Sequence, residues 1–422
     1  MNLTKYKIGE IAEINKTTIR NDDNLTDIMY LDTSSITDNE ISEIQNLKIE
    51  DAPSRAQRKV KDQTILYSTV RPRLNHHGIL NNPPQNLIVS TGYATIDIKD
   101  EYKGVIDSAF LYLTITQPFI TEYIANIADT AVSAYPSINP SDLDSIELKF
   151  PKYEIQKKIS DVWRNLDRQI SLLRSTNATL EAIAKQLYDY WFVQFDFPDA
   201  NGKPYKSSGG EMVWNERLKR EIPKGWKVEN LIDFAQIKNG ATPSTSDESN
   251  YGGDIVWITP KDLSDQKSKF IYQGERNITR QGFDSCSTSL LPIGSVLMSS
   301  RAPIGLVSIA KNEVCTNQGF KSLIPNNLDD SIYLYYYIKH HIQQIEQLGT
   351  GTTFKEVSRD DLCRFPILVV GAKEIYKQWI DIQNKIADKQ FVNTKQIATL
   401  TAQRDTLLPL LMNGQATVRE EA

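Results

Sequence analysis

The stretch Ile8–Ile14, IGEIAEI, decides the fold because a similar stretch, LIDFAQI, returns at Leu231–Ile237. Further pairs of similar stretches follow in the same order along the chain. They are Tyr30–Ile36 with Trp257–Leu263, Thr64–Ser68 with Ser295–Ser299, Gly92–Tyr93 with Gly319–Phe320, Phe110–Tyr112 with Tyr333–Tyr335, and Asp129–Leu143 with Gly349–Leu362. This ordered similarity predicts that one domain is duplicated within the chain.

Each copy ends in a segment whose apolar residues recur every seven positions, which is typical of a coiled coil. A helix of about 35 residues would be about 50 Å long. We expect the two helices to run antiparallel, because the first then carries the chain to the far end, where the second copy begins. The predicted contact positions are Ile159, Leu166, Leu173, Leu180 and Leu187, then Trp379, Ile386, Leu400 and Leu407, a row that Asn393 interrupts.

The predicted fold class is α+β: two similar α+β domains separated by two long helices that form an antiparallel coiled coil, with a pseudo-twofold internal repeat. The expected parts are a first domain at 1–150, a helix at 151–190, a linker at 191–225, a second domain at 226–370, a helix at 371–413 and a tail at 414–422. Aromatic residues of the linker region either pack it against the domain and helices or belong to a docking surface. These residues are Trp191, Phe192, Phe195, Phe197, Trp214 and Trp226.

The composition is that of a globular protein with more than one domain, since 422 residues exceed one ordinary core and 40% are hydrophobic. Cys286, Cys315 and Cys363 are widely spaced, which argues against a disulfide framework or a zinc cluster and favours a reducing compartment. The N-terminal residues lack the order of a signal peptide, and no apolar run reaches about 18 residues. We therefore expect a cytoplasmic protein without a membrane span.

A basic turn, YSTVRPRLNHHG at Tyr67–Gly78, follows an apolar run that predicts a strand. Arginine suits phosphate and guanine edges, so the turn is either a DNA contact or a solvated turn. The second copy has SRAPIG at Ser300–Gly305 in the matching place. Because the net charge is −5, any DNA contact has to be local. Because the two turns differ, we do not expect the two copies to recognise equal targets.

The central segment Tyr190–Val228 reads YWFVQFDFPDANGKPYKSSGGEMVWNERLKREIPKGWKV and is the most specific motif of the chain. Supporting motifs are Asp129–Pro151, Leu297–Ala310, Cys315–Phe320 and Gly349–Ile367. Together these motifs resemble those of the specificity subunit of type I restriction-modification systems, over essentially the whole chain. The first domain departs from the pattern, because it lacks the lead IPKGW that stands at Ile222–Trp226.

The resemblance implies a non-catalytic subunit with two target-recognition domains that bind double-stranded DNA. Each domain would recognise one half of a bipartite, asymmetric site, and the helices would set the gap. The implied partners are two methyltransferase (modification) subunits, which bind S-adenosylmethionine and methylate adenine, and restriction/translocase subunits. ATP and Mg²⁺ would belong to those partners, and this chain would hold no cofactor and no metal.

The candidate DNA contacts are residues whose side chains suit base edges or phosphates. In the first domain they are Arg71, Arg73, Asn75 and His76, with Arg55, Arg58, Lys59 and Lys61 expected on phosphates; in the second they are Arg301, Lys261, Gln318 and Lys321. The alternative is that Arg71 and Arg301 are structural and bond carbonyls in their turns.

No catalytic residue is predicted. Asn82–Gln85, NPPQ, resembles an amino-methyltransferase signature but has Gln85 where an aromatic residue would stack, so we expect a turn. Glu147 and Lys149 imitate part of a nuclease site, yet the alternation there predicts the polar face of a strand. His76 and His77 are adjacent and should point opposite ways. The competing class is a tandem-repeat protein-interaction scaffold with no nucleic-acid role.

Overall fold

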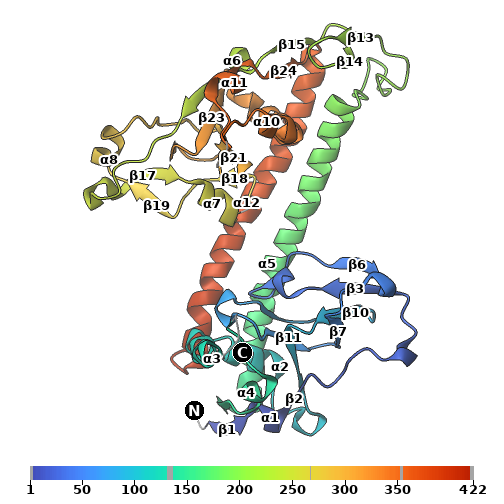
Figure 1. Ribbon diagram of the computed structural model, residues 1–422, viewed down its shortest axis with the longest axis vertical. Coiled ribbons are helices and arrows are strands. Elements are labelled where there is room, and N and C mark those ends of the chain that lie inside the picture. Colours follow the sequence, from blue (N-terminus) through green and yellow to red (C-terminus); the bar gives the residue numbers. More distant parts are fainter. Residues whose placement is uncertain (1–2, 131–135, 267, 352–354, 419–422) are drawn as a thin grey trace. The chain divides into compact units, whose positions relative to one another are not determined.

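A computed structural model describes residues 3–130, 136–266, 268–351 and 355–418 (Figure 1). Parts of two repeated stretches, 131–135 and 352–354, therefore lie outside the described residues. The chain divides into two compact units. Unit 1 comprises Met1–Arg174 and Gln396–Ala422, and unit 2 comprises Ser175–Lys395. Each unit thus holds one globular domain and a part of both long helices.

Unit 1 contains an antiparallel sheet in the order β2 (Ala12–Ile14), β11 (Tyr93–Ile98), β8 (Ile65–Ser68) and β9 (His77–Ile79). All residues of β8, β9 and β11 are buried. A second sheet has the order β6 (Gln45–Lys48), β3 (Asp27–Leu31), β10 (Leu87–Ser90) and β7 (Ala56–Lys59), with β3 and β10 parallel. Strand β1 (Thr4–Lys7) pairs with β12 (Glu147–Phe150). The helices are α1 (Ile8–Ile11), α2 (Ser108–Ile115), α3 (Pro118–Asp129) and α4 (Pro140–Asp144).

Unit 2 repeats this topology. Its larger sheet has the order β16 (Ala235–Asn239), β23 (Phe320–Pro325), β20 (Val296–Ser300), β21 (Ile304–Ala310) and an added strand β18 (Phe270–Ile271). In the smaller sheet β17 (Tyr251–Ile258) lies between β19 (Arg276–Ile278) and β22 (Cys315–Thr316). Strand β15 (Lys227–Asn230) pairs with β24 (Pro366–Val369). The helices are α6 (Leu231–Phe234), α7 (Pro260–Gln266), α8 (Arg280–Asp284), α9 (Ser331–His340), α10 (Ile342–Gln347) and α11 (Arg359–Arg364).

Equivalent backbone contacts confirm the repeat. The amide of Thr69 donates to the carbonyl of Gly92 over 2.9 Å, and the amide of Ser300 donates to that of Gly319 over 2.7 Å. The parallel pairs also match, because Tyr30 lies opposite Ile88 and Trp257 lies opposite Cys315. The similarity between the two halves of the sequence is therefore similarity of strand register.

The long helices α5 (Tyr153–Tyr188) and α12 (Lys373–Met412) run antiparallel. In unit 2, Gln383 Nε2 donates to the carbonyl of Ala184 over 3.0 Å, and Gln390 Nε2 donates to that of Asn177 over 3.2 Å. As the residue number rises along one helix it falls along the other. In unit 1, Leu411 packs in the same core as Ile159 and Trp163.

The burial along the helices corrects part of the predicted contact row. In α5 only Ile159 of that row is buried, and the other four leucines are half-buried. The more buried row is offset by three residues and includes polar side chains, which hid it from an apolar pattern search: Gln156, Trp163, Ile170 and Ala184, with half-buried Asn177. In α12, Trp379 is fully buried, Ile386 and Leu400 are half-buried, and Leu407 is 39% exposed, so Leu407 is outside the seam.

Asn393, which interrupts the predicted row, is itself fully buried. Its Nδ2 donates to Asn177 Oδ1 over 2.8 Å. A buried polar pair of this kind favours one register of a helix pair at some cost in stability. Asn393 therefore belongs to the contact between α5 and α12.

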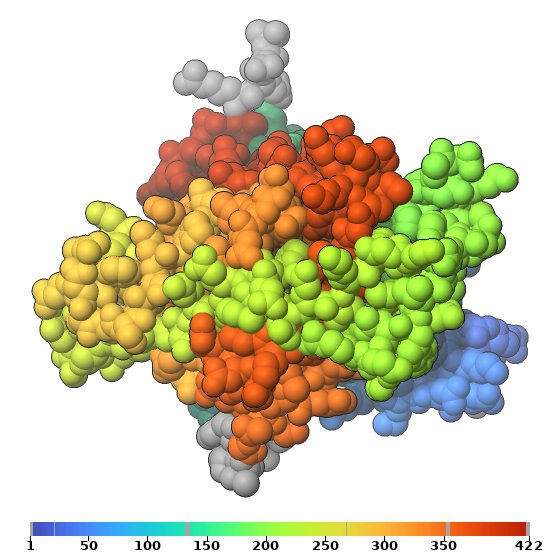
Figure 2. Space-filling view, turned by 90° about the horizontal axis from the view of Figure 1, so that it is seen from above, coloured from blue at the N-terminus to red at the C-terminus, as the bar shows by residue number. Residues whose placement is uncertain are grey.

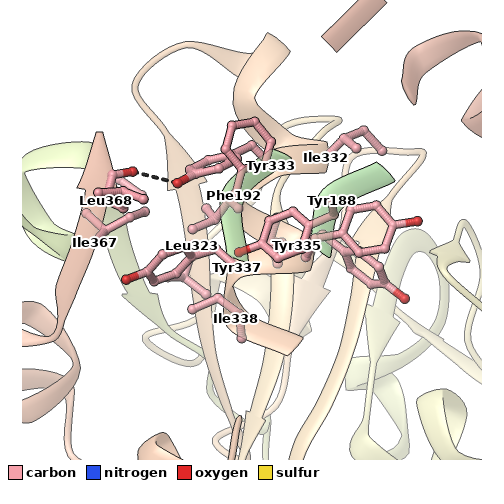
Figure 3. Packing of buried hydrophobic residues seen from close by; sticks show 14 of the residues in the cluster. Tyr188, Phe192, Leu323, Ile332, Tyr333, Tyr335, Tyr337, Ile338, Ile367 and Leu368 are labelled. Carbon is pink, nitrogen blue, oxygen red and sulfur yellow. Dashed lines mark hydrogen bonds between the residues drawn. The ribbon is translucent and has the colours of Figure 1, made fainter. Parts of the chain in front are cut away.

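The core of unit 2 is rich in aromatic rings (Figure 3). Tyr188 and Phe192 of the region that ends α5 pack against Tyr333 of α9, whose hydroxyl donates to the carbonyl of Leu368 over 2.6 Å. Trp379 packs edge-on against Phe192 at a ring distance of 4.8 Å. Five of the six aromatic residues singled out in the linker region are buried here: Trp191, Phe192, Phe195, Phe197 and Trp226. For these five the packing interpretation holds.

Trp214 is the exception. It lies on the hairpin of β13 (Met212–Asn215) and β14 (Arg220–Pro223) and is 58% exposed. The segment that follows α5, drawn in green, lies on the molecular surface in Figure 2. A docking role therefore stays open for Trp214 alone.

Candidate nucleic-acid interface

The first candidate surface is the turn that follows β8. It contains the short helix η4 (Pro72–Leu74), and its flanking residues Arg71 and Asn75 have positive φ angles of 48° and 53°. Such a conformation is uncommon for arginine and persists only where surrounding contacts impose it. Here Val70 forms a bridge with Ser137, and the Arg71 amide donates to the carbonyl of Pro136 over 2.9 Å. The chain thus presents exposed Arg71 and Arg73 on a fixed backbone.

Arg73 is fully engaged by carboxylates of α3. Its Nε and Nη2 donate to the two oxygens of Glu122 over 3.1 and 2.8 Å, and its Nη1 donates to Asp129 Oδ2 over 2.8 Å. The hydrogen bonds that Arg73 donates to Glu122, and then to Asp129, raise its pKa. The guanidinium remains charged but presents its donors to the protein.

The two histidines diverge, as their adjacency predicted. His76 Nδ1 lies 2.9 Å from the carbonyl oxygen of Ile36 and 3.0 Å from Thr37 Oγ1. His77 is buried, its Nδ1 lies 3.1 Å from the Tyr112 hydroxyl, and burial lowers its pKa to about 4. His76 therefore stays a candidate contact, whereas His77 belongs to the core.

The expected phosphate contacts of the first domain are not gathered into one patch. Exposed Arg55 precedes β7, which contains Arg58 and Lys59, whereas Lys61 lies 3.7 Å from Asp97 of β11. Lys59 Nζ lies 2.6 Å from Asp23. Arg58 is half-buried, its Nε has no hydrogen-bond partner among the described residues, and burial lowers its pKa. Of the four, Arg55 and Lys61 are the more accessible.

The candidate contacts of the second domain converge more closely. Arg301 follows β20, and Lys321 lies in the neighbouring strand β23, opposite Met298. Exposed Gln318 hydrogen-bonds Thr242. Lys261 is the second residue of α7, after Pro260, which a Cβ at Gly319 would touch. Lys261 Nζ also lies 2.8 Å from Glu275 Oε2, which raises the lysine pKa.

Glu356, which was not among the residues predicted from the sequence, lies close to two of these cations. Lys321, whose side chain is 8% exposed, places Nζ 3.0 Å from Glu356 Oε1, and Arg301 Nη1 lies 3.9 Å from Glu356 Oε2. Glu122, Asp129 and Glu356 were missed because they come from other elements and only the fold brings them to the cations. Their acidic side chains also gave no signal of a DNA surface.

The matched turns show how the arginines of the two domains correspond. The bridge from Val70 to Ser137 in unit 1 corresponds to the bridge from Arg301 to Glu356 in unit 2. In each domain the next residue has a positive φ angle, 48° for Arg71 and 43° for Ala302, and a proline follows it. Arg301 is therefore equivalent to Val70, and Arg71 to Ala302, so the basic side chain differs by one position between the turns.

The residues that imitate a nuclease site have structural roles. Asp142 Oδ2 accepts from the amide of Asn139 over 2.7 Å and caps α4. Glu147 and Lys149 are exposed on β12, whereas Leu148 and Phe150 are buried, as the alternation predicted. Across the described part of the chain, no helix is long and apolar enough to cross a membrane.

The fold and the sequence together define a tandem-repeat protein in which each α+β domain leads into a long helix. The model of a family described as type I restriction modification DNA specificity domain matches residues 2–182 and 223–408. The chain belongs to this family of type I restriction-modification specificity subunits.

Individual relatives agree. The chain is 27% identical over 469 residues to the type I restriction enzyme HindI specificity subunit of Haemophilus influenzae, covering 97% of this chain and 99% of that one. It is 44% identical over 144 residues to the MjaIX specificity subunit of Methanocaldococcus jannaschii, covering 34% and 33%. The crystal structure of the type I restriction-modification S subunit from M. genitalium has a similar fold, with a TM-score of 0.59 at 14% identity over 100% and 97% of the two chains.

Proposed function

We propose that this chain is the non-catalytic subunit that gives a type I restriction-modification complex its DNA specificity. Its target-recognition domains, at about 1–150 and 226–370, each bind one half of a bipartite, asymmetric site. The observation that carries this proposal is the pair of equivalent turns. They share strand register and backbone conformation but present Val70-Arg71 in one domain and Arg301-Ala302 in the other.

The residues are assigned roles from their chemistry. Arg71, Arg73 and Arg301 suit guanine edges, and Asn75 and Gln318 suit adenine, with about 1 to 3 kcal/mol of discrimination for each good bidentate pair. His76 lies on the same turn as Arg73 and contributes to the same surface. The remaining cations position the DNA through its phosphates: Arg55, Arg58, Lys59, Lys61, Lys261 and Lys321.

Membership of the family supports a proposal for the partners as well. Two methyltransferase subunits, with S-adenosylmethionine, methylate adenine within the half-sites, and restriction/translocase subunits use ATP and Mg²⁺. This chain directs both activities and performs neither.

The paired helices set the gap between the half-sites. Four residues inserted into one helix lengthen it by about 6 Å, which is close to two base pairs. The recognised gap should grow by about that amount, and an unchanged gap would refute this role.

The competing function is a protein-interaction scaffold, which the net charge of −5 favours mildly. Titrating salt against binding of the full chain to duplex DNA separates the two. A DNA-binding subunit loses affinity linearly on a log–log plot, with a slope of about −0.9 for each phosphate neutralised. A scaffold shows no such binding.

A further inference from the structure

Several of the cations expected on DNA are already paired with carboxylates of their own domain: Lys59, Lys61, Arg73, Lys261, Arg301 and Lys321. In unit 1, three nitrogens of Arg73 donate to Glu122 and Asp129 over 2.8 to 3.1 Å. The contact with Glu122 is bidentate, the geometry that arginine also uses for phosphate and guanine. Arg73 can therefore turn this bidentate face to a phosphate or a guanine only by leaving Glu122.

In unit 2, two candidate cations are also paired with a carboxylate, but through different residues. The Glu356 carboxylate lies 3.0 Å from Lys321 Nζ and 3.9 Å from Arg301 Nη1. Its backbone is held in place, because the Glu356 amide donates to the carbonyl of Thr350 over 3.0 Å and the amide of Val357 donates to that of Ser300 over 3.0 Å. One carboxylate thus faces two cations beside the turn.

The two arrangements are not copies of one ancestral contact. The position of unit 1 equivalent to Glu356 holds Ser137, and the carboxylates of unit 1 come from helix α3. The two domains therefore use different residues for the same kind of contact: Arg73 in the first turn and Arg301 in the second each lie beside a carboxylate of their own domain.

We propose that Glu122, Asp129 and Glu356 are internal counter-ions that weaken binding to DNA of any sequence and so increase the discrimination in favour of the target. A phosphate has to displace a carboxylate to reach the cation, so binding through charge alone gains less. A matching base edge adds hydrogen bonds that a wrong sequence lacks. This inference rests on the proposed function.

The test uses salt titrations of the full chain with short duplexes of random sequence. The variants are Glu356→Gln in domain 2 and Glu122→Gln/Asp129→Asn in domain 1. Glu216→Gln is the matched control, because Glu216 pairs with Lys219 over 2.9 Å in the linker and faces no candidate DNA contact. We expect the variants, but not the control, to bind up to about fivefold more tightly, the equivalent of an exposed ion pair. Their salt slope should steepen by about 0.9 for each cation released.

A purely structural role for these carboxylates would change stability without changing the salt slope. Slopes of the variants equal to those of wild type and Glu216→Gln, with wild type binding DNA, would overturn this inference alone. A wild-type chain that does not bind duplex DNA would overturn the proposed function and this inference with it. Because Lys321 is buried, Glu356→Gln could unfold; the Arg73 partners are exposed, so Glu122→Gln/Asp129→Asn then decides.

Discussion

The two turns that follow β8 and β20 have the same backbone conformation but different side chains. Both start from an amide that donates to the carbonyl of a glycine just before the neighbouring strand, Gly92 or Gly319. Both then place a residue with positive φ before a proline, but the arginine stands one position earlier in the second domain. The duplication has thus kept the backbone conformation and varied the side chains, which supports the proposal that the two domains recognise different half-sites.

The cores behind the turns differ as well. His77 lies opposite Tyr67 in the register of unit 1, and Val307 lies opposite Met298, the residue equivalent to Tyr67, in unit 2. A buried titratable side chain in one domain therefore replaces an apolar one in the other. The comparison between the two domains can be tested both in the cores and in the turns.

The largest expected effect comes from removing one core tryptophan at a time. Trp163→Ala and Trp379→Ala should each cost about 3 to 5 kcal/mol of unfolding free energy, because each side chain is buried among aromatic rings. Denaturant titration with limited proteolysis would show which unit is destabilised. Trp214→Ala, on the exposed hairpin, should change stability by less than about 0.5 kcal/mol. Equal destabilisation of both units by either core variant would show that they do not unfold separately.

Acid should destabilise unit 1 through His77. Its pKa is about 4 in the folded protein against 6.5 ordinarily, so the unfolded chain binds the proton first. Stability that is present above pH 6.5 is therefore lost as the pH falls towards 4, by about 3 kcal/mol. Asp38, 3.6 Å away, offers little compensation because burial raises its own pKa.

His77→Val copies the residue of the second domain and should remove this pH dependence from unit 1. Unfolding followed between pH 7 and 4 measures it. Because burial also lowers the pKa of His341 to about 4, unit 2 keeps an acid sensitivity of its own. An unchanged profile for unit 1 in His77→Val would contradict the assignment to His77.

Moving the arginine within the first turn should alter recognition. Val70→Arg/Arg71→Ala copies the order found at Arg301-Ala302, and the second domain already tolerates alanine at that positive φ. We expect a loss of about 1 to 3 kcal/mol on the original first half-site and no change on the second. Competition binding with duplexes altered in one half-site at a time measures both. A loss on both half-sites would mean that the turn acts through the fold.

The smallest effect is expected for a lysine on the surface of the second domain. Lys261→Ala should weaken binding to every sequence alike, by less than about 1 kcal/mol, because an exposed lysine contacts phosphate and is already paired with Glu275. Binding measured on cognate and random duplexes provides the comparison. A sequence-dependent loss would assign Lys261 to base recognition instead.

The sequence was sufficient for the duplication of an α+β domain, because matched stretches such as Thr64–Ser68 and Ser295–Ser299 fall on equivalent strands. Periodicity also located both helices, but it chose the less buried row of α5. The more buried row contains Gln156 and Asn177, whose polarity an apolar pattern excludes. In α12 the apolar pattern treated Asn393 as an interruption for the same reason, although Asn393 is buried and hydrogen-bonds Asn177.

The candidate interface was less accessible to sequence reasoning. The match of Thr64–Ser68 with Ser295–Ser299 already sets Val70 opposite Arg301, and the bridges to Ser137 and Glu356 show the same register. The carboxylates that meet Arg73 lie 49 and 56 residues further along the chain, so tertiary folding alone brings them together. Lys269, buried against Glu181 over 2.5 Å, was invisible for the same reason.

The measurement that tests the central claim most directly is a map of modified adenines. The chain would be co-expressed with its methyltransferase partner in a host free of adenine methylation. The account predicts one split, asymmetric motif with a fixed gap, in which each half depends on one domain. A contiguous or symmetric motif, or no methylation although both proteins are soluble and co-purify, would contradict it.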